Sequence, residues 1–166
     1  MRYFAGHQRT IARSIGRVVF AALLAALVPS LIADRSARAQ QVPPPDKPFA
    51  EHRIVLQLSD SDATKQGLVL SVANNLLKHY DPDKVAIVVV AFGPGIELLR
   101  PDNANRKRVE SLVAQGVRFD ICLNTVDSIE RESGKRPEFI SVATPVQVGV
   151  GQILLLTENG YTLVRP

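Results

Sequence analysis

The feature that most constrains the fold is an unbroken run of small and β-branched apolar residues at 85–91, Val-Ala-Ile-Val-Val-Val-Ala. A strand with one face in water alternates apolar and polar residues, whereas this run does not alternate. Both of its faces must therefore be covered, as in a central strand of a parallel sheet with helices on both sides. The run predicts an α/β protein.

Strand and helix patterns alternate on either side of this run. Four further segments have the pattern of strands: 53–58, 117–125, 139–143 and 161–164. Helices are expected after the caps at 59–62 as far as Tyr80, at about 104–115 before Gly116, from Val126 to about Glu132, and from Thr144-Pro145 to Gly160. This alternation predicts one three-layer αβα domain with a mainly parallel sheet of about five strands.

The first 39 residues have the pattern of a secretory signal peptide. Four arginines precede an apolar run at 18–28, and Ala37-Arg38-Ala39 is a small-x-small cleavage site. Pro29 interrupts the run well short of the roughly 20 apolar residues that a membrane span needs, so a retained anchor is the lesser alternative. A Pro-rich tether at 40–50 would then lead to the domain at 51–166, in a periplasmic or secreted protein.

The charge of the chain is concentrated in this leader. It holds six of the twenty Lys and Arg residues and one of the sixteen acidic residues, so 14 basic and 15 acidic residues follow it. The mature part is therefore close to neutral, and nucleic-acid binding is not expected. No metal-ligand spacing and no cofactor motif are present in the sequence.

The candidate catalytic residue is Cys122, the only cysteine, at the expected end of a strand. Asn124 and Thr125 follow it as candidate caps of the next helix. Ligands of open parallel sheets bind beyond the carboxyl ends of the strands, where helix N-termini favour anions such as a thiolate. A lone cysteine is, by default, an inert core residue. The candidate binding residues near this edge are Ser59, Asp60, Gly93, Pro94, Gly95, Asn124, Thr125 and Thr144.

Several short motifs over residues 53–166 resemble, in order and spacing, the DsrE/DsrF-like family. They are Leu-Gln-Leu-Ser-Asp at 56–60, Asn-Asn-Leu at 74–76, Phe-Gly-Pro-Gly-Ile-Glu-Leu-Leu at 92–99, Gly-Val-Arg-Phe at 116–119 leading to Cys122 and Asn124-Thr125, and Gly-Tyr at 160–161. The resemblance implies that Cys122 takes the position of the sulfur-accepting cysteine of sulfur-relay members. The leader and the Asn124-Thr125 pair depart from those members, which act in the cytoplasm.

Three interpretations of Cys122 follow. In the first, an exported protein carries a sulfane sulfur on Cys122 as a persulfide and exchanges it with a donor or a partner thiol. In the second, the same edge of the sheet is part of a non-catalytic, oligomeric module that binds a small ligand. In the third, Cys122 is simply buried packing. The apolar last helix, which carries Val148 and Leu155 beyond its core positions, predicts a homo-oligomer; the alternative is a central helix that the fold itself covers.

Overall fold

The computed structural model describes residues 47–166. The predicted leader at 1–39 and the tether as far as residue 46 lie outside this part of the chain. A five-stranded sheet is formed by β1 (His52–Leu58), β2 (Val85–Ala91), β3 (Val117–Cys122), β4 (Ala143–Val146) and β5 (Thr162–Val164). The strand order is β4-β3-β2-β1-β5, and every neighbouring pair is parallel. The predicted α/β class and the number of strands are confirmed.

The apolar run that dominates the sequence is β2, the middle strand of the sheet. All seven of its residues are buried. It pairs with β1 over seven residues and with β3 over five, so strands cover both of its edges. Its side chains enter two separate apolar clusters, one on each face of the sheet. The absence of polar alternation in the sequence therefore has the predicted structural cause.

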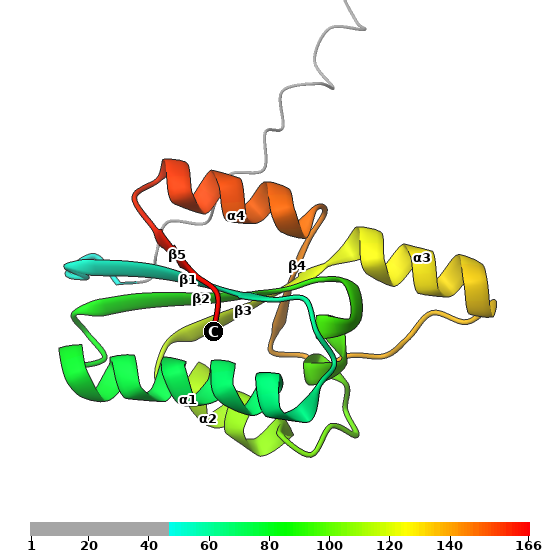
Figure 1. Ribbon diagram of the computed structural model, residues 1–166, viewed down its shortest axis with the longest axis horizontal. Helices are drawn as coiled ribbons and strands as arrows, with labels where there is room; N and C mark the ends of the chain where they lie inside the picture. Colours follow the sequence, from blue (N-terminus) through cyan, green and yellow to red (C-terminus); the bar gives the residue numbers. More distant parts are fainter. Residues whose placement is uncertain (1–46) are drawn as a thin grey trace, which may run out of the picture. The chain divides into compact units, whose positions relative to one another are not determined.

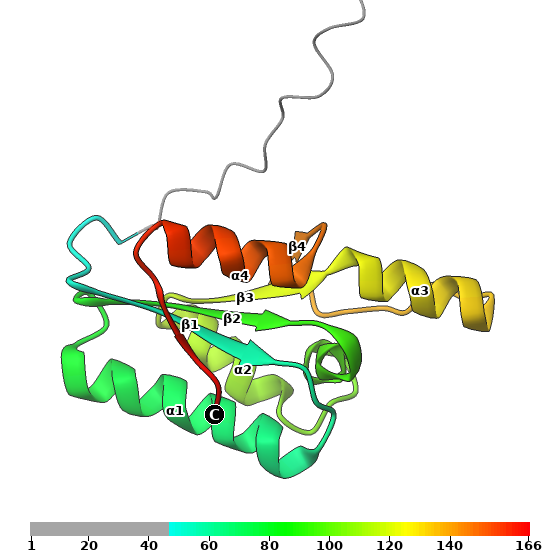
Figure 2. The ribbon, with the colours of Figure 1, turned by 45° about the horizontal axis from the view of Figure 1, so that its top comes forward.

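Helices cover both faces of the sheet (Figures 1 and 2). Helices α1 (Ala63–Tyr80) and α2 (Arg106–Ala114) lie on one face, and α4 (Gly149–Glu158) lies on the other. Helix α3 (Leu123–Ser133) extends beyond the sheet from the end of β3. The larger apolar cluster lies under α1 and α2 and contains Phe119, whereas a smaller one lies under α4.

The position of the fourth strand differs from the sequence prediction. It is Ala143–Val146, not 139–143, so Thr144 and Pro145 belong to this strand and do not begin the last helix. Pro145 is tolerated because β4 is an edge strand, where a missing N–H need not break a ladder. Helix α4 begins five residues later than predicted, at Gly149.

The segment that follows β2 is helical, which the sequence analysis did not predict. Residues Gly93–Leu99 form a 3₁₀ helix, η1, whose apolar residues are buried. A Cβ at Gly95 would lie 2.2 Å from the carbonyl oxygen of Leu58, so only glycine allows this close approach to the end of β1. The Gly-Pro-Gly sequence thus packs the start of η1 against the carboxyl end of the sheet.

Two of the last four residues of the predicted tether, Lys47 and Ala50, contact the domain. The Lys47 ammonium donates to the carbonyl oxygens of Pro82, Val85 and Gln115 at 2.6, 3.1 and 3.2 Å. Ala50 is buried beneath α4 in the smaller cluster. Within residues 47–166, no helix combines the length and the apolar character needed to cross a bilayer.

Candidate functional site

The site is arranged by strand β3, whose residues point alternately to the two faces of the sheet. Val117, Phe119 and Ile121 enter the large cluster beneath α1 and α2. On the other face, Asp120 and Cys122 contact helix α4 through hydrogen bonds. Because side chains two residues apart share a face of a strand, Arg118 belongs to this second set. One strand therefore supplies a purely apolar row to one face and a polar row to the other.

Cys122 is the last residue of β3, as expected for a cysteine at a strand end, but the strand ends at 122 and not at 125, and α3 begins at Leu123, three residues earlier than predicted. Its side chain is buried, with 5% of the residue exposed. The Gly149 N–H, at the first residue of α4, donates to Cys122 Sγ at 3.2 Å. The Sγ atom also lies 3.9 Å from the Gln147 carbonyl oxygen. The sulfur therefore contacts backbone polar groups at the start of a helix, not hydrocarbon alone.

Gly149 is the residue that lets α4 approach the cysteine. A Cβ at this position would lie 2.9 Å from Phe92 Cβ and 3.2 Å from Cys122 Cβ. Contacts that short require a neighbour to shift, so a side chain here would push the first turn of α4 away from β3. The N–H donor and the lack of a side chain at Gly149 act together to hold a backbone dipole against the sulfur.

Asn124 and Thr125 do not cap α3, which corrects the prediction. They lie inside its first turn, after Leu123, and the residue at the cap position is Cys122, which makes no side-chain capping bond. Instead, Thr125 Oγ1 accepts from the Gly93 N–H at 3.0 Å. Asn124 is bound twice to Gln147: its N–H donates to the Gln147 carbonyl at 3.1 Å, and its Oδ1 accepts from Gln147 Nε2 at 2.9 Å. These two residues therefore tie η1 and the loop before α4 to α3.

Most other predicted binding residues also lie at the carboxyl edge of the sheet. Gly93 and Gly95 lie against Leu58 and Ser59, the residues that end β1 and follow it. Pro94 lies in the first turn of η1.

Asp60 lies farther along the loop after β1, near the start of α1. It accepts from the Asp62 N–H at 2.8 Å and from the Lys65 ammonium at 2.7 Å, and the hydrogen bond with Lys65 lowers the pKa of this exposed carboxyl.

Thr144 is separated from this group. In the register of β3 with β4, Thr144 lies beside Asp120, while Val146 lies beside Cys122. Thr144 therefore lies two residues before the β4 position that is beside Cys122. The structure therefore brings together Cys122, Asn124, Thr125, Ser59 and the η1 glycines but leaves Thr144 on a different part of the same sheet face.

A buried ion pair beside the cysteine was not identified as a site feature from the sequence. Arg118 Nε and Nη2 donate to the two Asp120 carboxylate oxygens at 2.8 and 2.9 Å, and Gln152 Nε2 of α4 donates to Oδ2 at 3.0 Å. The Asp120 side chain is fully buried. Burial raises the pKa of Asp120, while the charge and hydrogen bonds of Arg118 and the Gln152 amide oppose this rise.

The sequence carries a partial signal for this pair. Arg118 and Asp120 alternate with apolar residues on the strand that ends at Cys122, which places all three on one face. Gly149 and Gln152 are three residues apart, so they share a face of α4. No local pattern, however, indicates that these two rows meet, because that contact joins residues about 30 positions apart.

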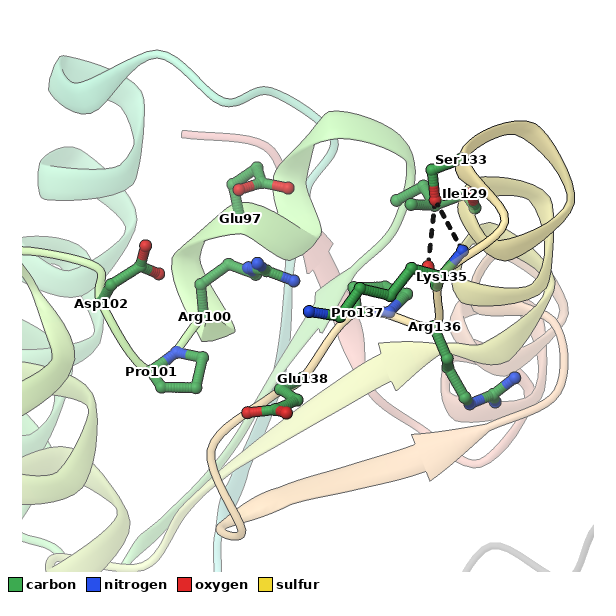
Figure 3. Close-up of a pocket in the computed structure, with 10 residues that line it drawn as sticks. All are labelled: Glu97, Arg100, Pro101, Asp102, Ile129, Ser133, Lys135, Arg136, Pro137 and Glu138. Carbon is green, nitrogen blue, oxygen red and sulfur yellow. Dashed lines mark hydrogen bonds between the residues drawn. The ribbon is translucent and has the colours of Figure 1, made fainter.

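Figure 3 shows a hollow away from Cys122. Residues of η1 and of the turn that follows it line one side, and residues 129–138 line the other. It contains none of the predicted site residues. Its ionisable side chains are three cations and three carboxylates, so it has no dominant charge. Among residues 47–166, no cluster of three or more His, Cys, Asp or Glu side chains is placed to hold a metal ion.

Comparisons with known proteins find two solved structures with a similar fold, one at higher and one at lower sequence identity. No family model matches the chain, and no curated protein does. The solved structure of MTH1491 from Methanobacterium thermoautotrophicum, a protein of unknown function, is 32% identical, with a TM-score of 0.63 over 70% of this chain and 100% of that one. The ychN protein of E. coli is 15% identical, with a TM-score of 0.52 over 69% of this chain and 99% of that one, which supports the fold alone.

Proposed function

We propose that this protein is an exported sulfur carrier in which Cys122 bears the transferred sulfur. The chain belongs to the same family as MTH1491. The resemblance of residues 53–166 to DsrE/DsrF-like proteins supports both the wider family assignment and this function. The observation that carries the proposal is the Gly149 N–H held 3.2 Å from Cys122 Sγ at the carboxyl edge of the sheet. A donor there stabilises negative charge on sulfur.

The proposed transfer needs no other cofactor or oxidant. The Cys122 thiolate attacks the outer sulfur of a persulfide donor, the donor's S–S bond breaks, and the donor leaves as a thiolate. A new S–S bond on Cys122 now holds the sulfur as a persulfide. A partner thiolate then attacks that outer sulfur in the same way and releases Cys122 as its thiolate, so the protein ends unchanged.

The burial of Cys122 supports a small donor. With 5% of Cys122 exposed, a bulky donor cannot reach Sγ unless the first turn of α4 moves. The hydrogen bonds of Asn124 with Gln147 and of Thr125 with Gly93 hold the segments next to Cys122 in place. We therefore expect small donors, such as inorganic polysulfide or a low-molecular-weight persulfide, to load Cys122 faster than a large aromatic disulfide reagent modifies it.

Intact-protein mass spectrometry tests the proposal. After exposure to inorganic polysulfide, the chain should gain the mass of one sulfur atom, and treatment with a small thiol should remove it. Cys122→Ala should gain nothing under the same conditions. An unmodified wild-type chain, under conditions that load a reference persulfide carrier, would refute the sulfur-carrier function.

A specific observation supports the alternative of an oligomeric binding module. Three apolar residues at α4 are exposed. Val148, just before the helix, is 42% exposed, and Val150 and Leu154 within it are 59% exposed each. Val150 and Leu154 are four residues apart, so they lie on the same face of the helix. A neighbouring apolar row of this kind favours contact with a second copy of the chain beside the cysteine.

Light scattering distinguishes this assembly from a monomer. The wild-type mass should be a multiple of the chain mass, and Leu154→Glu should lower it without unfolding the protein. Leu68→Glu is a matched control, because Leu68 is 47% exposed on α1, on the opposite face of the sheet. A monomeric wild-type protein would rule out the assembly. Retained assembly with loss of all sulfur loading in Cys122→Ala would show that the two functions are separate.

A further inference from the structure

A further hollow lies at the amino-terminal end of the strands, opposite the end that carries Cys122, and its lining includes residues from both faces of the sheet. Its volume is about 650 Å³, within the range of small-molecule sites. Its floor includes Ala86 and Val88 of β2 and Arg118 of β3. Thr144 of β4, Tyr161 after α4, and residues 113–117 before and at the start of β3 also line it.

The path of α4 explains why this part of the sheet is open. The first residue of α4 contacts Cys122, at the carboxyl end of β3. After its last turn, the chain continues through Tyr161 into β5, at the far edge beside β1. The helix therefore crosses from β3 toward β5, and the amino-terminal part of β3 and its neighbour β4 remain uncovered on this face.

Three hydrogen-bonding groups that line the hollow have unused capacity. Arg118 uses Nε and Nη2 to bind Asp120, and its Nη1 makes no hydrogen bond within residues 47–166. The hydroxyls of Tyr161 and Thr144 likewise have no partner in this part of the chain. Every fully buried polar side-chain atom there does have a partner. All three residues line the hollow, and 6% of Tyr161 is exposed.

The charges around the hollow nearly cancel, so an anion would be selected by the free edge of the Arg118 guanidinium and not by a net positive charge. The Arg118 guanidinium is offset by buried Asp120, and Lys47 on the rim is offset by nearby Asp83. The Lys47 ammonium has already filled its donors with three carbonyl oxygens. A planar carboxylate matches the remaining edge of the guanidinium, whereas a doubly charged phosphate would find little excess positive charge.

We propose that this hollow binds a small organic carboxylate, with the carboxylate on Arg118 and the hydroxyls of Tyr161 and Thr144, and the apolar body on Val113 and Val142, the partly exposed apolar residues of its lining. Polar groups at one end and apolar residues at the other are the usual arrangement of a small-molecule site. The site is separate from Cys122 and is independent of whether that residue carries sulfur.

Benzoate is a suitable probe, because it combines a carboxylate with a flat apolar body. Titrated into the ¹⁵N-labelled full chain, it should shift the backbone amide signals of Gly116, Val117 and Thr144. Neutral benzamide, which has the same shape, should bind at least about tenfold more weakly, since it lacks the charge-assisted bond. Inorganic phosphate should not compete.

Three variants test the contacts. Arg118→Gln combined with Asp120→Asn removes both charges without leaving one buried alone, and should weaken benzoate binding by roughly tenfold or more. Tyr161→Phe should weaken it by about three- to tenfold. Arg100→Gln, in the hollow of Figure 3, should leave binding unchanged.

Four outcomes would overturn the proposal. They are the absence of shifts up to the solubility limit of benzoate, shifts centred on Cys122 instead of Gly116, equal binding of benzamide, and unchanged affinity in both the double variant and Tyr161→Phe. Tyr161→Phe retains the ring and the Arg118 pair, so a loss of binding in this variant cannot be attributed to an unpaired buried charge.

Discussion

The two faces of strand β3 differ more than any other two regions of the molecule. Toward α1 and α2, the strand presents Phe119 and its apolar neighbours to the large core cluster. Toward α4, it presents an arginine, a fully buried aspartate and a cysteine, which α4 contacts through Gln152 and Gly149. The first face can be stabilised by apolar burial, whereas the second depends on specific hydrogen bonds. Each buried polar group on this second face needs its own hydrogen-bond partner from α4. Such groups are typical of functional sites and are uncommon in apolar cores.

The largest expected effect is on the apolar face. Phe119 is fully buried, so Phe119→Ala removes an aromatic ring from the centre of the large cluster and leaves a cavity. We expect the free energy of unfolding to fall by about 3–5 kcal/mol, as for other buried aromatic residues. Urea unfolding followed by circular dichroism measures this change. A loss below about 1 kcal/mol would mean that this face does not dominate stability.

The next effect concerns the ion pair on the other face. Arg118→Ala leaves the Asp120 carboxylate buried without its cation, which in other proteins costs about 3–5 kcal/mol. Because the Arg118 side chain is 22% exposed, water can partly replace it, so we expect a loss near the lower limit. The same urea measurement applies. A loss equal to that of Asp120→Asn would show that stranding the charge adds nothing.

The pH dependence of stability gives a separate measure of Asp120. Burial raises its pKa in the folded protein above the ordinary value of 3.8. The folded state therefore holds this proton more tightly than the unfolded state does, and the resulting stabilisation is present below pH 3.8 and lost as the pH rises through the raised pKa. The unfolding free energy of the wild type minus that of Asp120→Asn should fall over this range and level off above it. A difference that rises instead would mean that Arg118 outweighs burial.

A pair of glycine substitutions in α4 separates the effect of an added side chain on the helix itself from its effect on the contact between α4 and Cys122. Gly149→Ala places a Cβ 2.9 Å from Phe92 Cβ, so we expect a loss of about 1–3 kcal/mol and a change in the rate at which a small thiol reagent modifies Cys122. Gly151→Ala meets only Val148 at 3.4 Å and should leave that rate unchanged while stabilising the helix by up to about 1 kcal/mol. Equal thiol reactivity in both variants would show that Gly149 does not position α4 against Cys122.

These two faces also show what the sequence can and cannot predict. The sheet and its middle strand follow from the residue pattern of β2, because a run buried on both sides has few alternatives. The fourth strand was misplaced because three of the residues at 139–142 are apolar for another reason. Ile140 packs into the large cluster, and its N–H donates to the Leu99 carbonyl of η1 at 2.9 Å, so this segment covers the core as a loop.

The predicted site was incomplete for a similar reason. The position of Cys122 follows from local alternation in β3, but its hydrogen-bonding partner does not. Gly149 contacts Cys122 across 27 residues of chain, and a glycine needed for close tertiary approach looks the same in sequence as one in a turn. The caps predicted at Asn124 and Thr125 failed because both side chains bind partners outside their own helix, which local propensity cannot show.

The smallest expected effect tests the hydrogen bond between α3 and η1 at the carboxyl edge of the sheet. Thr125→Val keeps the shape of the side chain but removes the acceptor of the Gly93 N–H, leaving a part-buried donor unpaired at the start of η1. We expect a loss of about 1 kcal/mol. Thr157→Val is the control, because its hydroxyl bonds an exposed carbonyl of its own helix and should cost little. Hydrogen exchange of the Gly93 amide is the sharper measurement, since it should quicken in Thr125→Val alone. An unchanged rate would mean that η1 is held by Gly95 packing against Leu58, and that Thr125 contributes nothing to the shape of the approach to Cys122.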